Sequence, residues 1–568
     1  MSNNNDAAIA LLEKHFDIAF AAPDGIKKLR ELILSLAMQG KLVPQDPSDQ
    51  PASELLKEIG AEKNRLVKEG KIKQSKPLPE IKPKEIPYDL PKGWEWSRLG
   101  ECTNIIMGQS PDSNSYNEEG QGLPFFQGKS EYGVIYPTPR KWCTLPLKVA
   151  PVKSVLISVR APVGPTNICN IIACIGRGLA AIQGLANTPE FFLLYYFRCF
   201  EKHIASFGTG STFSAITLKV LENLLVPLPP LAEQRRIVAK IDELMARCDE
   251  LKKLRSDRDR QQITVHTAAL NRLLIAKEQS EFNTAWQFIT QHFSELYLVK
   301  ENVAELRKAI LQLAVMGKLV PQDSKDQPAS ELLKEIEKEK ERLVKEGKIK
   351  KSKPLPEIKS NEFPYNLPKS WEWVRFGIIV QSMTNGLYKP SQFYSDKGVK
   401  IVRMFNIQDG FLDIEQVKRI EVTQEEIENY KLSLGDILVN RVNSLELIGK
   451  SALVRDEDLQ DKLVFEAMNI RVSCFFRETN LPNYANLLLQ TINARSYLIG
   501  QAKRALGQVS INQPQVSNLL FPLPPLAEQR RIVAKIDQLM ALCDNLEKQI
   551  NNANSKQTNL LNAVMTKI

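Results

Sequence analysis

Two long stretches of this sequence occur twice, and that internal repeat restricts the chain to architectures built from two similar halves. Residues 29–100 recur almost unchanged at 306–377, and the stretch PLPPLAEQRRIVAKID occurs at 227–242 and again at 522–537. Self-similarity at a fixed offset is the pattern of a duplicated structural unit. The sequence therefore predicts two protomers fused head to tail, related by a pseudo-twofold internal repeat.

The segment between the repeated stretches differs in the two halves. The first stretch recurs at a shift of 277 residues and the closing stretch at a shift of 295, so the intervening segment is 18 residues longer in the second half. Within these variable segments, 93–226 and 370–521, the halves lose obvious similarity. We therefore expect one repeated scaffold that carries two domains with different recognition surfaces.

The closing stretch predicts a long helix in each half. Apolar residues from Ile237 to Leu254, and from Ile532 to Ile550, alternate steps of three and four along the chain. Each helix is expected to run about 45 residues, or roughly 65 Å at 1.5 Å per residue. We expect the two helices to pair as an antiparallel coiled coil. The alternative is that each packs only on its own domain.

The other shared region, 25–75 and 302–352, is also predicted to be helix-rich. It leads into KIKQSKPLPEIKPKEIP, where prolines every few residues favour an extended linker. The lysines of this linker either contact phosphate or are simply solvated, and the sequence leaves both readings open.

The variable segments read as mixed α/β with many short strands. The buried-strand runs 155–159 and 437–439 are each followed closely by an arginine, Arg160 and Arg441. Small polar loops at 208–217 and 507–512 come shortly before the closing helix. A loop that enters a DNA groove and a plain strand-to-helix connection have this same composition, so both remain possible.

Composition favours a polyanionic partner. Lysine and arginine number 76 against 66 acidic residues, which gives a net charge of +10 and a pI near 9.0. A soluble protein with a lysine-rich surface would have the same balance. The longest apolar run, 191–197, is far shorter than the roughly 20 residues of a membrane span, and the amino terminus lacks a secretory pattern. We expect a cytoplasmic protein.

Searches for catalytic and metal-binding motifs fail. No CxxC pair occurs and the four histidines are far apart in sequence. Cys248 and Cys543 lie on the helical stripe, where a thiol acts as a small apolar side chain. Residues 122–130 imitate a phosphate-binding loop, but five residues separate the glycines and Pro124 would block the backbone. We therefore predict no catalytic, cofactor-binding or metal-binding residue.

Taken with these features, the chain resembles the specificity (S) subunits of Type I restriction-modification systems over nearly its whole length. The resemblance is carried by the doubled PLPPLAEQRRIVAKID, the doubled LPKxWEW at 90–96 and 367–373, SVLISVRAPVG at 154–164 and GDILVNR at 435–441. The doubled GKLVPQD and PASELLKEI framework is similar to the IB subfamily.

The resemblance implies an α+β fold, with two mixed α/β target-recognition domains joined by long conserved helices that form an antiparallel coiled coil. The expected domains are an N-terminal helical conserved region and linker at 1–92, target-recognition domain 1 at 93–228, a central conserved region at 229–369, target-recognition domain 2 at 370–523, and a C-terminal conserved long helix at 524–568.

The family further implies a noncatalytic subunit that reads an asymmetric bipartite target in double-stranded DNA. It would dock two methyltransferase (M) subunits and, through them, the restriction/translocase (R) subunits. S-adenosylmethionine, ATP and magnesium would bind those partners, with no cofactor on this chain. The alternatives are a stand-alone two-headed DNA-binding regulator, a nuclease or methyltransferase in its own right, and a coiled-coil adaptor that binds only protein.

Candidate DNA-contacting residues come from the strand ends and polar loops of the variable segments. Arg160 and Arg441 are the candidates at strand ends, and Lys129, Arg140, Lys141, Lys503 and Arg504 are possible phosphate partners. The remaining candidates lie in or near the loops: Thr209, Ser211, Thr212, Ser214, Asn443, Gln508, Ser510 and Asn512.

Overall fold

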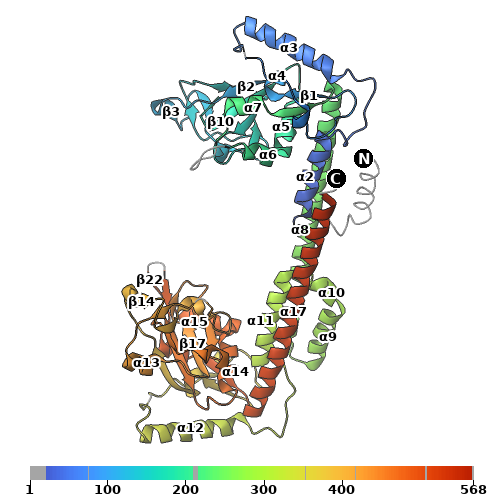
Figure 1. The fold of residues 1–568 in the computed structure, drawn as a ribbon. Helices are drawn as coiled ribbons and strands as arrows, with labels where there is room; N and C mark the ends of the chain where they lie inside the picture. Colours follow the sequence, from blue (N-terminus) through green and yellow to red (C-terminus); the bar gives the residue numbers. More distant parts are fainter. Residues whose placement is uncertain are drawn as a thin grey trace. The chain divides into compact units, whose positions relative to one another are not determined.

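The computed structural model describes residues 21–74, 76–208, 215–351, 353–415, 417–505 and 508–565. The chain divides into two compact units, the first formed by Met1–Asp257 with Ala553–Ile568 and the second by Arg258–Asn552. Each unit contains a sheet-rich domain and a helical part (Figure 1). The predicted α+β class with two mixed domains and long helices is confirmed.

Two main sheets, mostly antiparallel, form the domain of the first unit. The four-stranded sheet has the order β2-β10-β7-β8, and the five-stranded sheet has the order β3-β5-β4-β9-β6, in which β4 and β9 are parallel. The strands of this unit are β1 (Glu95–Arg98), β2 (Thr103–Met107), β3 (Tyr116–Asn117), β4 (Leu123–Phe126), β5 (Trp142–Cys143), β6 (Val149–Ala150), β7 (Val155–Ser158), β8 (Thr166–Ile168), β9 (Ala173–Ile175), β10 (Leu179–Gly184) and β11 (Leu225–Leu228). Its helices are α2 (Gly25–Met38), α3 (Ala52–Lys68), α4 (Leu99–Cys102), α5 (Glu190–Cys199), α6 (Glu201–Ser206), α7 (Leu218–Glu222) and the first part of α8 (Leu231–Ile275).

In the domain of the second unit, the four-stranded sheet repeats the strand order of the first domain, the other main sheet has one strand fewer, and a three-stranded sheet is added. Its two main sheets have the orders β13-β21-β17-β19 and β14-β16-β15-β20, and β15 and β20 are parallel. The strands are β12 (Glu372–Arg375), β13 (Val380–Asn385), β14 (Tyr394–Ser395), β15 (Val399–Val402), β16 (Arg419–Ile420), β17 (Asp436–Asn440), β18 (Val442–Asn443), β19 (Ser451–Leu453), β20 (Leu463–Phe465), β21 (Asn469–Cys474), β22 (Lys503–Ala505), β23 (Gln508–Ser510) and β24 (Leu520–Leu523). The helices are α9 (Gln279–Gln291), α10 (Phe293–Leu296), α11 (Lys300–Val315), α12 (Ala329–Lys345), α13 (Gln424–Tyr430), α14 (Leu481–Leu489), α15 (Ile492–Gln501), α16 (Gln513–Ser517) and α17 (Leu526–Met565).

Each domain begins and ends at the same place. The strand that contains the WEW motif pairs with the strand that contains the PLPPL motif, so Trp96 lies opposite Pro227 and Trp373 lies opposite Pro522. Prolines are tolerated there because these two-stranded ladders have free edges. The repeated motifs therefore bring the two ends of each variable segment together on one pair of strands.

The helical parts of the two units are built from the same three pieces. In the first unit α2 packs against the first half of α8, where Arg30 pairs with Asp249 at 2.5 Å, and Leu561 from the end of α17 is fully buried beside Leu32. In the second unit the equivalent pieces are α11, the first half of α17 and the end of α8. There Arg307 pairs with Asp544 at 2.6 Å.

Both long helices were predicted correctly. Helix α8 has 45 residues and α17 has 40 in the described range. In the second unit they run in opposite directions (Figure 1), and Leu270 and Leu273 of α8 share a core with Leu539 of α17. Cys248 and Cys543 are 1% and 3% exposed, as expected for apolar positions.

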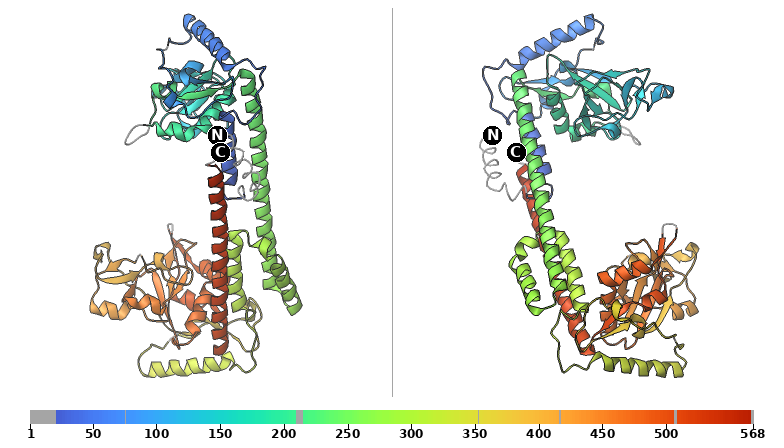
Figure 2. Two further views of the ribbon diagram at one scale, coloured as in Figure 1. Left: turned by 45° about the vertical axis from the view of Figure 1, so that its right-hand side comes forward. Right: turned by 180° about the vertical axis from the view of Figure 1, so that it is seen from behind.

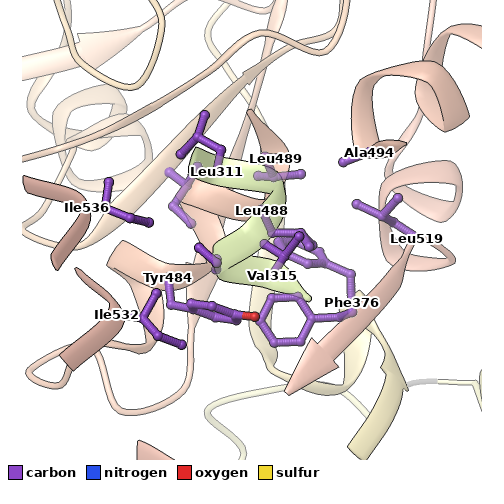
Figure 3. Close-up of a cluster of buried hydrophobic side chains, with 14 of the residues drawn as sticks. Leu311, Val315, Phe376, Tyr484, Leu488, Leu489, Ala494, Leu519, Ile532 and Ile536 are labelled. Carbon is purple, nitrogen blue, oxygen red and sulfur yellow. The ribbon is translucent and has the colours of Figure 1, made fainter. Parts of the chain in front are cut away.

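Apolar packing joins the sheet-rich domain of the second unit to the helices of that unit. Figure 3 shows this cluster, in which side chains of α11 and α17 meet those of α14. Tyr484 of α14 is fully buried there and its hydroxyl donates a hydrogen bond to the Pro522 carbonyl at 2.9 Å. The labelled residues are Leu311, Val315, Phe376, Tyr484, Leu488, Leu489, Ala494, Leu519, Ile532 and Ile536. Most of this side-chain surface is apolar, so its burial is a major stabilising contribution.

A buried glutamate near the start of each long helix gathers the repeated motifs into a polar clasp. Glu528 is 1% exposed, and its two carboxylate oxygens accept hydrogen bonds from the Trp371 indole at 2.9 Å and from the Gln322 amide at 2.6 Å. One turn along, Arg531 forms a two-pronged ion pair with Asp326, with the closer contact at 2.6 Å. These residues belong to the repeated VPQDxxD, WEW and LAEQRR motifs.

The first unit contains the same clasp. Glu233 accepts hydrogen bonds from Trp94 at 2.9 Å and from Gln45 at 2.8 Å, and Arg236 pairs with Asp49 at 2.6 Å. Burial raises the pKa of Glu233 and of Glu528 above the usual value, against the hydrogen bonds that lower it. Because buried polar groups are costly unless paired, each donor is needed to hold its glutamate in place.

Replacing Trp371 by phenylalanine should lower the free energy of unfolding of the second unit by about 1–3 kcal/mol, because a buried carboxylate oxygen loses its donor. Urea unfolding followed by circular dichroism measures this loss. The matched control is Trp373→Phe, since Trp373 is half-buried and its indole nitrogen makes no hydrogen bond within the described ranges. Equal losses in the two variants would contradict the clasp.

Candidate nucleic-acid interface

The structure brings most of the predicted residues of the second domain into one small sheet. Strands β18, β23 and β22 form this sheet in the order given, with Val442 opposite Ser510 and Arg504 opposite Val509. Lys503, Arg504 and Gln508 are exposed on it. Strand β22 lies at the end of the domain opposite α12 (Figure 1), and two further views are given in Figure 2.

Two predicted residues of this domain have structural partners. The Arg441 guanidinium is half-buried and donates to the Ala467 carbonyl at 3.2 Å. Asn512 begins α16, where its side-chain oxygen accepts from the Gln515 backbone amide at 3.0 Å. Capping of α16 is a sufficient structural role for the Asn512 side chain. Asn443 differs, because its buried amide nitrogen has no partner among the described residues.

In the first domain the predicted residues are more dispersed. Arg160 is exposed and forms an isolated bridge with Ala215, at the end of the predicted 208–217 loop. The other predicted residues of that loop, Thr209, Ser211, Thr212 and Ser214, lie outside the described residues.

Lys129, Arg140 and Lys141 lie near the five-stranded sheet of the first domain. All three are exposed, and none has an ion-pair partner in the part of the chain that the structure describes. The intervening chain folds back on itself, since the Thr138 amide donates to the Glu131 carbonyl at 2.8 Å. Their role as phosphate partners stays a prediction.

Arg160 and Arg441 do not occupy equivalent positions. The Ile216 amide donates to the Val159 carbonyl at 3.0 Å, and the Ile511 amide donates to the Arg441 carbonyl at 2.9 Å. Val159 is therefore the counterpart of Arg441, and Arg160 is the counterpart of Val442. Because successive side chains of a strand alternate between faces, the two arginines point to opposite faces.

Sequence analysis missed a polar cluster at the ends of β15 and β20. Arg403 follows β15 and Glu466 follows β20, and their side chains approach to 3.6 Å between Nε and Oε1. The two residues are 63 positions apart, and the parallel pairing that joins them leaves no local pattern. The only local signal is that each ends a short apolar run with a charge.

Clusters of metal-ligating side chains are absent from the described ranges. Within those ranges, no three His, Cys, Asp or Glu side chains are grouped so as to hold a metal ion. Burial raises the pKa of Cys102 and of Cys474 to about 12, so these thiols stay protonated. Residues 123–126, within the segment that imitates a phosphate-binding loop, form strand β4.

The fold is thus a duplicated helical scaffold that carries two domains with the same core strand order and different surface side chains. The family model of the Type I restriction modification DNA specificity domain matches residues 91–258 and 368–553. The specificity subunit of the Type I restriction enzyme EcoAI from Escherichia coli is 38% identical over 577 residues, which covers 95% of this chain and 93% of that protein. The EcoEI specificity subunit, also from Escherichia coli, is 35% identical over 569 residues, with the same coverage.

A solved structure of the HsdS subunit from Thermoanaerobacter tengcongensis is 38% identical over a match that covers 44% of this chain and 52% of that one, with a TM-score of 0.30. From the family model and the two full-length relatives, the chain belongs to the DNA specificity subunits of Type I restriction-modification enzymes. It is therefore a noncatalytic subunit for DNA recognition. Placement in the IB subfamily stays a prediction.

No helix within the described ranges is both long enough and apolar enough to cross a membrane.

Removing the two exposed cations of β22 should weaken DNA binding and its dependence on salt. In Lys503→Ala/Arg504→Ala, the slope of log affinity against log salt should fall by about 0.9 for each phosphate that these side chains no longer neutralise. Anisotropy titrations of a mixed-sequence duplex with the full-length chain measure that slope. Lys334→Ala/Lys338→Ala on α12 removes the same charge from the opposite side and should leave the slope unchanged. A fall in the slope of the control alone would exclude β22 as a phosphate-binding strand.

Proposed function

We propose that this chain reads an asymmetric DNA target in two separated parts, one with each recognition domain. The observation that carries the proposal is the pair of equivalent clasps. Each clasp holds one of two domains that share their core strand order but differ in their surface side chains. Bases are read by the side chains that reach their edges, so unlike surfaces favour unlike half-sites. A palindromic target would require two matching surfaces.

The long helices support a fixed gap between the half-sites. Each of them is continuous through parts of both compact units, since α8 begins in the first unit and ends in the second, and α17 does the reverse. Duplex DNA rises about 3.4 Å per base pair, so a spacer of set length fixes the number of unread base pairs.

Two methyltransferase subunits would dock on the duplicated helical parts, and restriction/translocase subunits would join through them. In the second unit, α8, α9, α11 and α17 surround an apolar groove of about 620 Å³. Trp286 and Leu542 on its lining are 47% and 57% exposed, and exposed apolar area of this kind marks an interaction surface. S-adenosylmethionine, ATP and magnesium would bind these partner subunits.

Lengthening both long helices by one heptad should widen the gap between the half-sites. Seven helical residues inserted after Asp257 and after Asn552, where α8 and α17 pass between units, add about 10 Å, or about three base pairs. Sequencing of methylated positions in cells that carry the variant measures the gap. Seven flexible residues inserted after Lys351, in the exposed linker, serve as the control. An unchanged gap in the helix variant would refute the spacer role.

Exchanging the first recognition domain should change one half-site only. Residues 93–226 are replaced by the equivalent segment of the EcoAI specificity subunit, with Trp94 of the clasp retained in the exchanged segment. Because both ends of the domain lie on one two-stranded ladder, the exchange leaves the second unit untouched. The methylated sequence is then compared with that of the parent chain. Changes in both half-sites would show that the domains do not act separately.

A further inference from the structure

Four strands of the second domain end close together, at β13, β15, β17 and β20. The Leu387 amide, just after β13, donates to the Phe465 carbonyl of β20 at 2.8 Å. The Glu466 amide donates to the Val402 carbonyl of β15 at 2.9 Å. Asn440, the last residue of β17, donates from its side-chain nitrogen to the Met404 carbonyl at 3.4 Å. We call this place the convergent edge.

Arg403 is held in a fixed orientation on the convergent edge. Its guanidinium lies 5.7 Å from the Tyr394 ring centre and 5.5 Å from that of Phe405. The Arg403 Nε is buried 3.6 Å from a Glu466 oxygen, and the Tyr394 hydroxyl donates to that same oxygen at 3.3 Å. The rings and the carboxylate thus restrict the guanidinium from three directions.

The far end of Arg403 remains available. Its side chain is 28% exposed, and its two terminal nitrogens make no hydrogen bond within the described ranges. The Phe405 ring that covers it is itself 60% exposed, and Tyr388 beside the same edge is 77% exposed. Aromatic rings this exposed contribute little to a protein core and are suited to contact a flat ligand.

The surroundings carry further unpaired polar atoms. A second Glu466 oxygen and the side-chain oxygens of Asn440 and Asn469 are buried without a partner among the described residues. Asn443, with its unpaired amide nitrogen, follows β17 on β18 and connects this edge to the sheet that carries Lys503 and Arg504. Buried polar groups in native proteins are normally paired, so a cluster of unpaired ones indicates a place where a polar ligand binds.

We propose that Arg403 reads a guanine in the half-site of the second domain, with Glu466 as its positioning residue. This inference rests on the proposed function and names a residue of that site. A guanidinium with two free nitrogens in one plane matches the two acceptors that guanine presents in the major groove. A fixed orientation limits the entropy lost on binding.

The first domain has a different side chain at the equivalent place. Its Gly176 amide donates to the Phe126 carbonyl at 2.8 Å, as the Glu466 amide does to Val402, so Gln127 and Gly176 correspond to Arg403 and Glu466. A glutamine side chain can form two hydrogen bonds with adenine, as arginine can with guanine. Arg403→Gln therefore imports the side chain of the first domain into the second.

The test is a selection from duplex DNA with two randomised blocks, using the full-length chain copurified with the methyltransferase subunit of its system. The half-site of the second domain is the one that stays constant when residues 93–226 are exchanged. The parent chain should enrich a guanine there, on one strand or the other. Arg403→Gln should reduce that preference on the order of tenfold, in favour of adenine, with the other half-site unchanged. Glu466→Gln should weaken the same preference without creating a new one.

Arg455→Gln is the matched control, because Arg455 is an exposed arginine of the same domain, with 52% of its side chain accessible. Its selected sequence should equal that of the parent chain, and thermal unfolding shows whether each variant is folded. The inference alone is overturned if the parent chain selects a two-part sequence and Arg403→Gln selects the same one. It is also overturned if the variant only binds all bases more weakly, with no change in preference. If the parent chain selects no two-part sequence, the proposed function fails and the inference fails with it.

Discussion

A buried carboxylate, present once in each half, ties together segments that are far apart in sequence. Glu233 and Glu528 each accept hydrogen bonds from a tryptophan at the start of a recognition domain and from a glutamine in the preceding helical region. A buried charge lacking its donors would be strongly destabilising, so the three motifs must occur together or not at all. This requirement accounts for the near-identity of the repeated stretches. It places no demand on the domain between them, whose sequence is free to change.

In this fold, the residues that hold each domain on the helices are therefore separate from those that we propose contact DNA. Both domains keep the same strand order and the same close approach of strand ends, where a side chain on Gly108 or Gly386 would lie 2.1 Å or 2.3 Å from a carbonyl oxygen. Glycine is the residue that such an approach allows. Around these fixed points the exposed side chains differ, with Gln127 in one domain and Arg403 in the other. A common backbone with replaceable side chains is a suitable basis for recognising different sequences.

The sequence predicted the features that repeat or have a local period. The two long helices, the buried positions of Cys248 and Cys543, and the two mixed domains all follow from periodicity and from the doubled motifs. Contacts between distant segments were not predictable in this way. The hydrogen bond from Trp371 to Glu528 joins residues 157 positions apart, and Arg403 meets Glu466 only through a parallel pair of strands. Arg160 and Arg441 looked alike because each follows an apolar run, yet a one-residue offset in register places them on opposite faces.

The sharing of α17 between the two units has a consequence for how the protein is made. Leu561 completes the small core around Ala22 and Leu32, so the amino-terminal unit lacks one of its parts until synthesis is nearly finished. The ribosome must release the last turns of the chain before that unit can close. Until then Ala22 and Leu32 lack Leu561 as a packing partner, so this part of the first unit closes only after the rest of the chain has been made.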